Sequence, residues 1–272
     1  MKKRIRLILN ILLVLAMIFG TAKFVLSRIE DRRSRQEYDQ ALQVAAGEAE
    51  QTAPNQEPDL TGPAEQIADE IPEDPVIQEL LAIDLAALQA ENEDVIGWIR
   101  IPDTEINYPL LQWTDNEFYL NHTWNQKENA SGAIFMECQN APDFTDFNTI
   151  IYGHNMNSGT MFGSLHHYRW PNYWQQHPYI YILNEEGVLR YDVFAAQSAS
   201  TKAIIYGLGI ETDQRKEEFF RFAQDYSFFE TDLKPTTEDR VLTLSTCTGS
   251  GHVYRWVVLG ILNEECSVKR PA

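Results

Sequence analysis

The sequence predicts a mainly β domain, either a barrel or a sandwich, and two observations carry that prediction. The first is a series of short runs rich in β-branched and aromatic residues over residues 97–262, separated by turn residues. The second is that only one strong helical pattern interrupts these runs, over residues 212–228, where aromatic side chains share a face. With 272 residues, the chain has room for one sizeable domain and its appendages.

Each predicted strand is a short extended run beside a turn signal. The clearest signal is Asn184-Glu185-Glu186-Gly187, which joins two neighbouring strands. In chain order, the predicted strands cover residues 97–102, 106–112, 133–136, 148–152, 179–183, 188–197, 241–248 and 254–262. The helix over 212–228 is therefore inserted before the seventh strand.

The N-terminus joins a basic start to a long apolar run. Residues 7–26 are apolar apart from a few small or polar side chains and Lys23, and about 20 apolar residues are enough to span a bilayer. The positive charges in front predict that residues 1–6 are a cytoplasmic tail, that 7–26 form a transmembrane signal-anchor and that the remainder is exported. A cleaved signal peptide is the alternative, because Gly20-Thr21-Ala22 offers small residues at a cleavage point.

The negative charge is concentrated before the predicted domain. The formal net charge is -18, and residues 36–94 hold sixteen acidic residues and no Lys or Arg. No basic face is evident to neutralise phosphates, which argues against nucleic acid as a partner. Residues 27–74 have few large apolar side chains, so we expect an acidic extracytoplasmic spacer, partly helical near 38–46.

A helix is predicted where the spacer ends. Asp74 supplies an N-cap and Pro75 suits the first helical position. Apolar residues then recur at helical spacing up to Leu88, which predicts a helix over 75–92 that packs one side on the domain.

The seventh strand carries the first candidate catalytic residue. With period two, Leu242 and Leu244 point to one face, while Cys247 lies at the strand end on the other face. If this strand pairs with the next about Gly251, Cys247 and Arg255 fall opposite one another on the same face. A nearby guanidinium favours the thiolate, so Cys247 is a candidate nucleophile.

A histidine at another strand end is the candidate acid and base. His154 follows an apolar strand and a glycine, and imidazole is the usual partner of a cysteine nucleophile. His154 could be imagined as a metal ligand with His166 and His167, but adjacent histidines point apart and no acidic ligand has suitable spacing. We therefore expect no metal and no cofactor.

Two motifs resemble a known family. Thr243-Leu244-Ser245-Thr246-Cys247 resembles the signature of the sortases, in which a threonine, a leucine, any residue and a threonine precede the catalytic cysteine. Tyr152-Gly153-His154-Asn155-Met156, followed by Met161-Phe162-Gly163-Ser164-Leu165, is similar to the catalytic histidine region of class B sortases. Arg255 matches the family arginine.

The resemblance extends over residues 76–262. The run 97–102 with Tyr108-Pro109, and Asp115-Asn116 with Tyr119-Leu120, resemble the first strands of class B members. The helix over 212–228 is similar to the inserted helix that distinguishes this class. The resemblance implies a closed β-barrel of about eight strands with an N-terminal helix and an inserted helix before the cysteine strand. The catalytic domain would cover residues 75–266, with a tail over 267–272.

The implied activity is that of a cysteine transpeptidase in a Gram-positive-type bacterium, held in the cell membrane by one span with its catalytic domain outside. The Cys247 thiolate would attack the carbonyl after the threonine of a C-terminal sorting signal, and His154 would protonate the leaving amine. Arg255 would hold the substrate backbone and stabilise the oxyanion. An amine of the peptidoglycan cross-bridge or of a pilin would then resolve the thioester.

The implied partners are exported proteins with an LPxTG-like or NPxTN-like signal, the acceptor amine and the lipid bilayer. We expect Tyr152, Asn155, Ser245 and Thr246 to contact substrate, and the alternative is that they only finish strands and turns. Two rival functions stay open: a thiol protease that hydrolyses the same signal, and a non-catalytic scaffold.

Two further cysteines have no assigned role. Cys138 stands where class B members commonly show an aromatic residue, and Cys266 lies near the C-terminus. Outside the cell the pair could form a disulfide, and two buried free thiols fit the sequence equally well.

Overall fold

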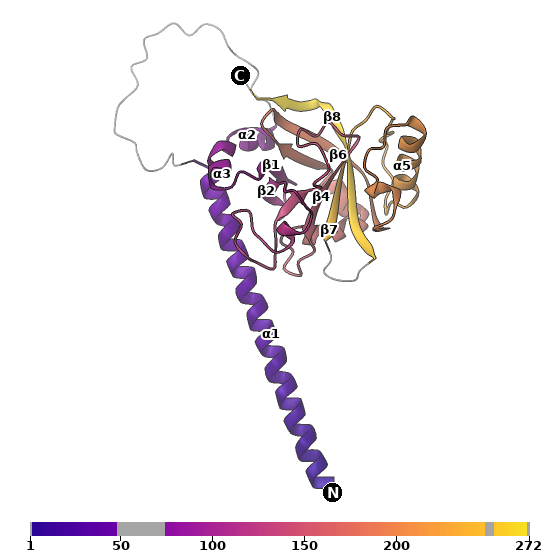
Figure 1. The fold of residues 1–272 in the computed structure, drawn as a ribbon. Helices are drawn as coiled ribbons and strands as arrows, with labels where there is room; N and C mark the ends of the chain where they lie inside the picture. The colour runs from indigo at the N-terminus through magenta and orange to yellow at the C-terminus, as the bar shows by residue number, and fades with distance from the viewer. Residues whose placement is uncertain (1, 48–73, 248–252, 271–272) are drawn as a thin grey trace, which may run out of the picture.

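The computed structural model describes residues 2–47, 74–247 and 253–270, and at Cys247 it describes the backbone. Eight strands close into a barrel in the order β1-β2-β3-β4-β7-β8-β6-β5 (Figure 1). The β2–β3 and β4–β7 pairs are parallel, and the other six are antiparallel. The strands are β1 Val95–Arg100, β2 Asn107–Leu111, β3 Ile134–Met136, β4 Asn148–His154, β5 Tyr179–Leu183, β6 Gly187–Ser200, β7 Val241–Cys247 and β8 Tyr254–Lys269. The predicted mainly β fold and its closed eight-stranded barrel are confirmed.

The barrel wall around β7 is buried on both faces. Leu242 and Leu244 point into the main core of the barrel, as their alternation predicted. Val241 belongs instead to a second cluster outside the wall, where Phe219 and Phe220 of α5 (Asp213–Asp225) cover the sheet. The inserted helix therefore lies outside the barrel wall, against β6 and η3 (Figure 1).

The predicted helix over 75–92 is two helices. The helices α2 (Pro75–Leu81) and α3 (Leu85–Glu91) are separated at Asp84, whose carboxylate accepts a hydrogen bond from the Ala87 N–H and caps the second helix. An aspartate that bonds to the backbone ahead of it starts a new helix rather than continuing the old one. Asp74 caps α2 as predicted. Both helices bury leucines in the main core.

Part of the predicted acidic spacer is helical and packed. Helix α1 runs without a break over Lys2–Ala45, and its last turns lie beside the barrel (Figure 1). Tyr38, Ala41 and Ala45 are buried there. Their spacing puts one tyrosine and two small residues on a single stripe, and small side chains let a helix approach closely without a wide apolar face. The helix expected near residues 38–46 is confirmed as the end of α1, and composition did not predict that it packs on the barrel. Residues 48–73 of the predicted spacer lie outside the described residues.

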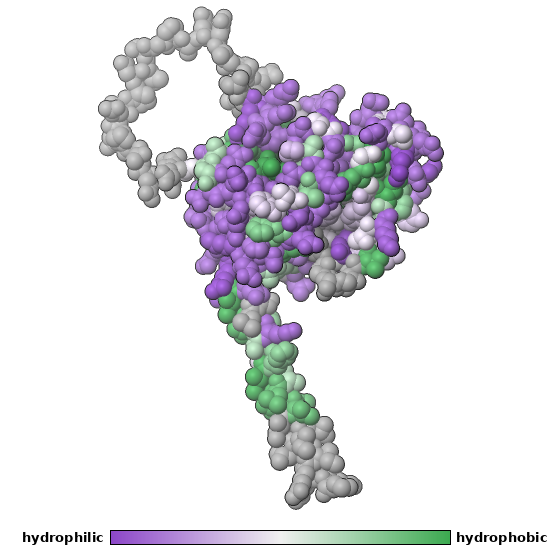
Figure 2. All heavy atoms as spheres, viewed as in Figure 1, coloured by the Kyte–Doolittle hydropathy of each residue, from purple (hydrophilic) through white to green (hydrophobic). Residues whose placement is uncertain are grey.

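The first part of α1 projects from the barrel and carries the apolar segment. Figure 2 shows hydrophobic side chains gathered along it. Among the described residues, this helix alone is long and apolar enough to cross a membrane, a test that a signal sequence also passes.

Short helices complete the connections. They are η1 (Phe118–Leu120), η2 (Gly163–Arg169), α4 (Pro171–Gln176) and η3 (Ile204–Tyr206). Two of them, η1 and η3, flank the barrel wall that holds the candidate site.

Candidate active site

The parallel pair β4–β7 aligns two candidate residues. The register runs without a shift from Asn148 opposite Val241 to His154 opposite Cys247. Partner residues in a parallel pair direct their Cβ atoms to the same face of the sheet. Because Leu242 and Leu244 face the core, the alternate positions up to Cys247 and its partner His154 lie on the outer face.

The antiparallel pair β7–β8 adds the arginine. This ladder ends with Ser245 opposite Val257, and the same register continued by two residues would set Arg255 opposite Cys247. Arg255 also pairs with Ala199 of β6, whose side chain lies in the outer cluster. The ladder thus has the register about Gly251 that the sequence predicted. His154, Cys247 and Arg255 occupy three adjacent strands at one end of the barrel.

A backbone carbonyl orients the histidine. The His154 Nε2 lies 2.6 Å from the Leu120 oxygen, at the end of η1. A carbonyl only accepts, so Nε2 is the protonated nitrogen, and the neutral ring keeps its other lone pair on Nδ1. This contact fixes both the tautomer and the plane of the half-buried ring.

A chain of buried polar groups ties the cysteine strand to the insertion before it. Thr243 Oγ1 donates to Asn148 Oδ1 at 2.7 Å, and Asn148 Nδ2 donates to the Ile205 carbonyl of η3 at 3.0 Å. Ser245 Oγ lies 2.8 Å from the hydroxyl of Tyr206. The outer-face hydroxyls of β7 therefore hold η3 over the sheet.

The four expected substrate contacts fall into two groups. Ser245 and Thr246 are 1% and 0% exposed, and Thr246 Oγ1 accepts a hydrogen bond from the Trp256 N–H. Tyr152 is half-buried with its hydroxyl donating to Glu137 Oε2, while Asn155 is exposed directly after His154. Only the second group presents side-chain surface beside the site.

Sequence reasoning missed the Leu120 carbonyl and Tyr206. A carbonyl carries no residue signal, although Tyr119-Leu120 stood in a family-like motif. Tyr206 and Ser245 are 39 positions apart in the chain, and no local sequence pattern predicts their contact.

The adjacent histidines and the two other cysteines have contacts or states of their own. The expectation that His166 and His167 point apart is wrong, because their rings meet edge to face with centroids 4.2 Å apart. The His167 ring also stacks on Trp170. Cys138 and Cys266 are free, half-buried thiols, so the disulfide alternative is wrong.

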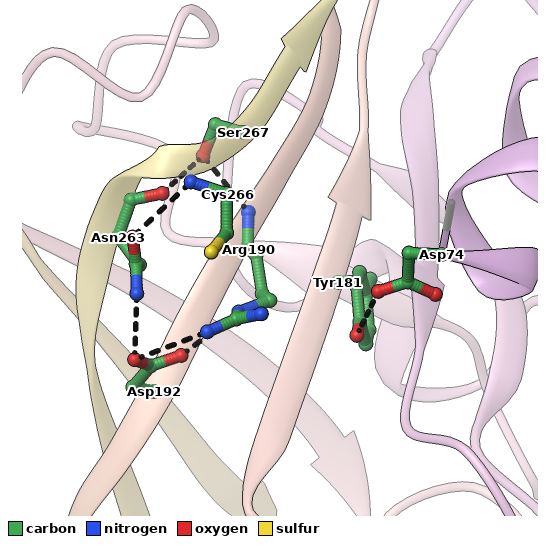
Figure 3. Close-up of polar contacts among 7 residues, drawn as sticks. All are labelled: Asp74, Tyr181, Arg190, Asp192, Asn263, Cys266 and Ser267. Carbon is green, nitrogen blue, oxygen red and sulfur yellow. Dashed lines mark hydrogen bonds and ion pairs between the residues drawn. The ribbon is translucent and has the colours of Figure 1, made fainter. Parts of the chain in front are cut away.

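Cys266 belongs to a polar network on β6 and β8 (Figure 3). Arg190 binds Asp192, which accepts from Asn263, and Asn263 accepts from the Cys266 N–H. These contacts close the far end of the two long strands, away from Cys247.

The comparisons with known proteins agree with this geometry. A family model described as the sortase domain matches residues 99–263, more than half of the chain. The chain belongs to the sortase family. Sortase B of Staphylococcus aureus is 30% identical over 248 residues, covering 90% of each chain. Sortase B of Listeria monocytogenes is 36% identical over 166 residues, covering 60% of this chain and 67% of that protein.

Solved structures place this sortase in class B. The Staphylococcus aureus sortase B-substrate complex superposes with a TM-score of 0.69 at 28% identity, covering 86% of this chain and 98% of that one. The crystal structure of Staphylococcus aureus sortase B gives a TM-score of 0.64 at 32% identity, covering 66% and 86%. The chain is a class B sortase with the cysteine transpeptidase activity of that family, and it processes sorting signals.

Proposed function

We propose that this sortase is a membrane-anchored transpeptidase that works through Cys247, His154 and Arg255. It cleaves a C-terminal sorting signal after threonine and transfers the exported protein to an amine of the cell wall or of a pilin. The observation that carries this proposal is the β4–β7 register, which ends with His154 opposite Cys247 on the outer face.

The chemistry follows from the contacts of His154. The Cys247 thiolate attacks the threonine carbonyl and forms a tetrahedral intermediate. His154, as imidazolium, donates its Nδ1 proton to the departing amine, the C–N bond breaks and a thioacyl enzyme remains. The neutral ring then keeps its proton on Nε2, where the Leu120 carbonyl accepts it. An acceptor amine loses a proton to Nδ1 as it attacks the thioester, and the thiolate is restored.

Arg255 carries the electrostatic part of the proposal. Its guanidinium stays charged throughout and can donate to the oxyanion and to the substrate backbone. A preorganised donor aimed at a developing oxyanion lowers the activation free energy by about 3 kcal/mol. Its place on β8 supports this role, because the β7–β8 register, extended two residues beyond Ser245 and Val257, would put Arg255 opposite Cys247.

We assign the four neighbouring residues two different tasks. Asn155 and Tyr152 contact the signal peptide, since they offer side-chain surface beside His154. Ser245 and Thr246 act from within the wall, because they are buried and bonded to Tyr206 and to the Trp256 N–H.

The anchor supports a location at the cell membrane, with the N-terminus cytoplasmic and the barrel outside. Substrates with LPxTG-like or NPxTN-like signals are themselves membrane-bound during export, so tethering raises their effective concentration at the enzyme. The apolar part of α1 would lie in the bilayer, and its last turns join it to the barrel without a flexible break.

A product assay separates transfer from hydrolysis. The full chain in detergent micelles is incubated with LPxTG and NPxTN peptides, with and without triglycine as the amine. We expect a product joined to triglycine that increases with its concentration. If only the free acid appears at every triglycine concentration, the enzyme is a protease rather than a transpeptidase. If neither peptide is cleaved and Cys247 is never acylated, the scaffold reading replaces both.

A further inference from the structure

Residues 118–132, between β2 and β3, form the loop that orients His154, and we call them the 118–132 loop. Its Leu120 carbonyl accepts the hydrogen bond from His154 Nε2. The loop folds back on itself, with the Asn129 N–H donating to the Asn121 carbonyl and the Ala133 N–H donating to the Tyr119 carbonyl. The position of Leu120 therefore depends on both the outgoing and the returning segment of this loop.

Helix α1 holds the returning segment of the loop. The buried hydroxyl of Tyr38 donates to the Gly132 carbonyl at 2.6 Å. Gly132 has φ +58, and a Cβ there would lie 2.5 Å from the Tyr119 oxygen and 2.7 Å from the Leu120 oxygen. The Gly132 backbone thus packs directly against the carbonyl that binds His154. One hydrogen bond and one van der Waals contact connect Tyr38 to the Leu120 oxygen.

Glu37 holds the tip of the same loop. Its backbone carbonyl accepts from Trp124 Nε1 at 2.8 Å. Its carboxylate Oε2 accepts from Asn125 Nδ2 and from Lys127 Nζ, both at 2.9 Å. Adjacent residues of α1 therefore bind the loop at two separated places.

Asn92 and Asp94, between α3 and β1, secure the other side of the loop. The Tyr119 hydroxyl donates to Asp94 Oδ2 and accepts from Asn92 Nδ2, and Asn92 also donates to the Trp124 carbonyl. These bonds hold the start and the tip of the loop, but Gly132 receives its side-chain bond from Tyr38. Burial raises the pKa of Tyr38 well above its ordinary value, so its hydroxyl keeps the proton that it donates.

We propose that Tyr38 and Glu37 are positioning residues for His154, so that the helix that begins in the membrane segment also completes the catalytic site. They act by clamping the 118–132 loop, which fixes the Leu120 carbonyl and through it the His154 ring. The inference rests on the proposed role of His154 as the acid and base for Cys247.

A one-atom deletion with a matched control tests the clamp. Tyr38→Phe removes only the hydroxyl that binds Gly132. Tyr168→Phe is the control, because the Tyr168 hydroxyl is also buried and also donates to a backbone carbonyl, that of His177 at 2.7 Å. Tyr168 lies in η2 and His177 follows α4, outside the 118–132 loop. The two variants should lose similar stability, and only the first should disturb His154.

The readout is the pH dependence of Cys247 alkylation by iodoacetamide in the full chain in detergent micelles. Peptide mass mapping separates Cys247 from Cys138 and Cys266. We expect Tyr38→Phe to move the Cys247 profile toward that of an ordinary thiol and to lower kcat on a cleaved LPxTG or NPxTN peptide about 10-fold, with KM unchanged. Glu37→Ala should act in the same direction, and Glu37→Gln, which keeps an acceptor oxygen, should recover much of the loss.

Two results overturn the inference. One is a Tyr38→Phe profile that coincides with the wild type and with Tyr168→Phe. The other is a loss of kcat in Tyr38→Phe that Tyr168→Phe reproduces at equal loss of Tm, which would make the effect one of stability. Failure of the proposed function has a different signature: His154→Ala would then leave the alkylation profile of the wild-type enzyme unchanged.

Discussion

The contact between Ser245 and Tyr206 separates two roles for the cysteine strand. Ser245 is 1% exposed, and its Oγ lies 2.8 Å from the Tyr206 hydroxyl. Either substitution, Ser245→Ala or Tyr206→Phe, removes that hydrogen bond, and a neutral bond of this kind contributes about 0.5–1.5 kcal/mol to stability. For a folded unit of this size, 1 kcal/mol corresponds to a shift in Tm of about 2–4 °C.

A double-mutant cycle measures the contact. Urea unfolding of the wild type, both single variants and the double variant gives the coupling free energy, which we expect to be about 1 kcal/mol. In peptide cleavage, Ser245→Ala should have no further effect in the Tyr206→Phe background, because the hydroxyl acts through η3. A coupling near zero, together with a rise in KM for Ser245→Ala in both backgrounds, would show that Ser245 contacts substrate directly and would refute this reasoning.

Three further outcomes follow from the local structure. Gly153→Ala places a Cβ 2.8 Å from the ring of Phe162, so overpacking should lower the free energy of unfolding by about 1–3 kcal/mol in urea titrations and reduce peptide cleavage. Asp84→Ala removes the N-cap of α3 and should cost about 1 kcal/mol in the same titration, leaving kcat unchanged. Burial and the neighbouring Glu137 carboxylate raise the pKa of the Cys138 thiol, so its alkylation at pH 8 should be slow, and Glu137→Gln should accelerate it. An unchanged free energy of unfolding in Gly153→Ala would contradict the first expectation, and a lower kcat in Asp84→Ala would contradict the second. An unchanged rate of Cys138 alkylation in Glu137→Gln would contradict the third.

The barrel was predictable because its strands carry local signals. Leu242 and Leu244 alternate with polar residues, and the turn at 184–187 is closed by Asn184, which accepts from the Gly187 N–H. The break at Asp84 and the packed end of α1 were not predictable in the same way. The break has a local cause, the Asp84 carboxylate that caps α3, which the helical spacing of the apolar residues did not reveal. The packed end of α1 depends on partners far along the chain, such as the Gly132 carbonyl that binds Tyr38.

The candidate site shows the same division. Strand periodicity placed Cys247 and Arg255 on one face. The strand end after Gly153 singled out His154 among six histidines, and the family resemblance then supported that choice. The parts that orient these residues are a backbone carbonyl at Leu120 and a hydroxyl at Tyr206. Neither has a residue pattern that marks it, because each acquires its role only when distant segments pack together.

The most direct test of the proposed site is the mass of the enzyme after brief exposure to a sorting-signal peptide. We expect intact mass spectrometry of the full chain to show a thioacyl adduct of the peptide part ending in threonine, mapped to Cys247 and absent in Cys247→Ala. His154→Ala and Arg255→Ala should form it far more slowly. An adduct on Cys138 or Cys266, or one that forms at the wild-type rate without His154, would contradict the three-residue site.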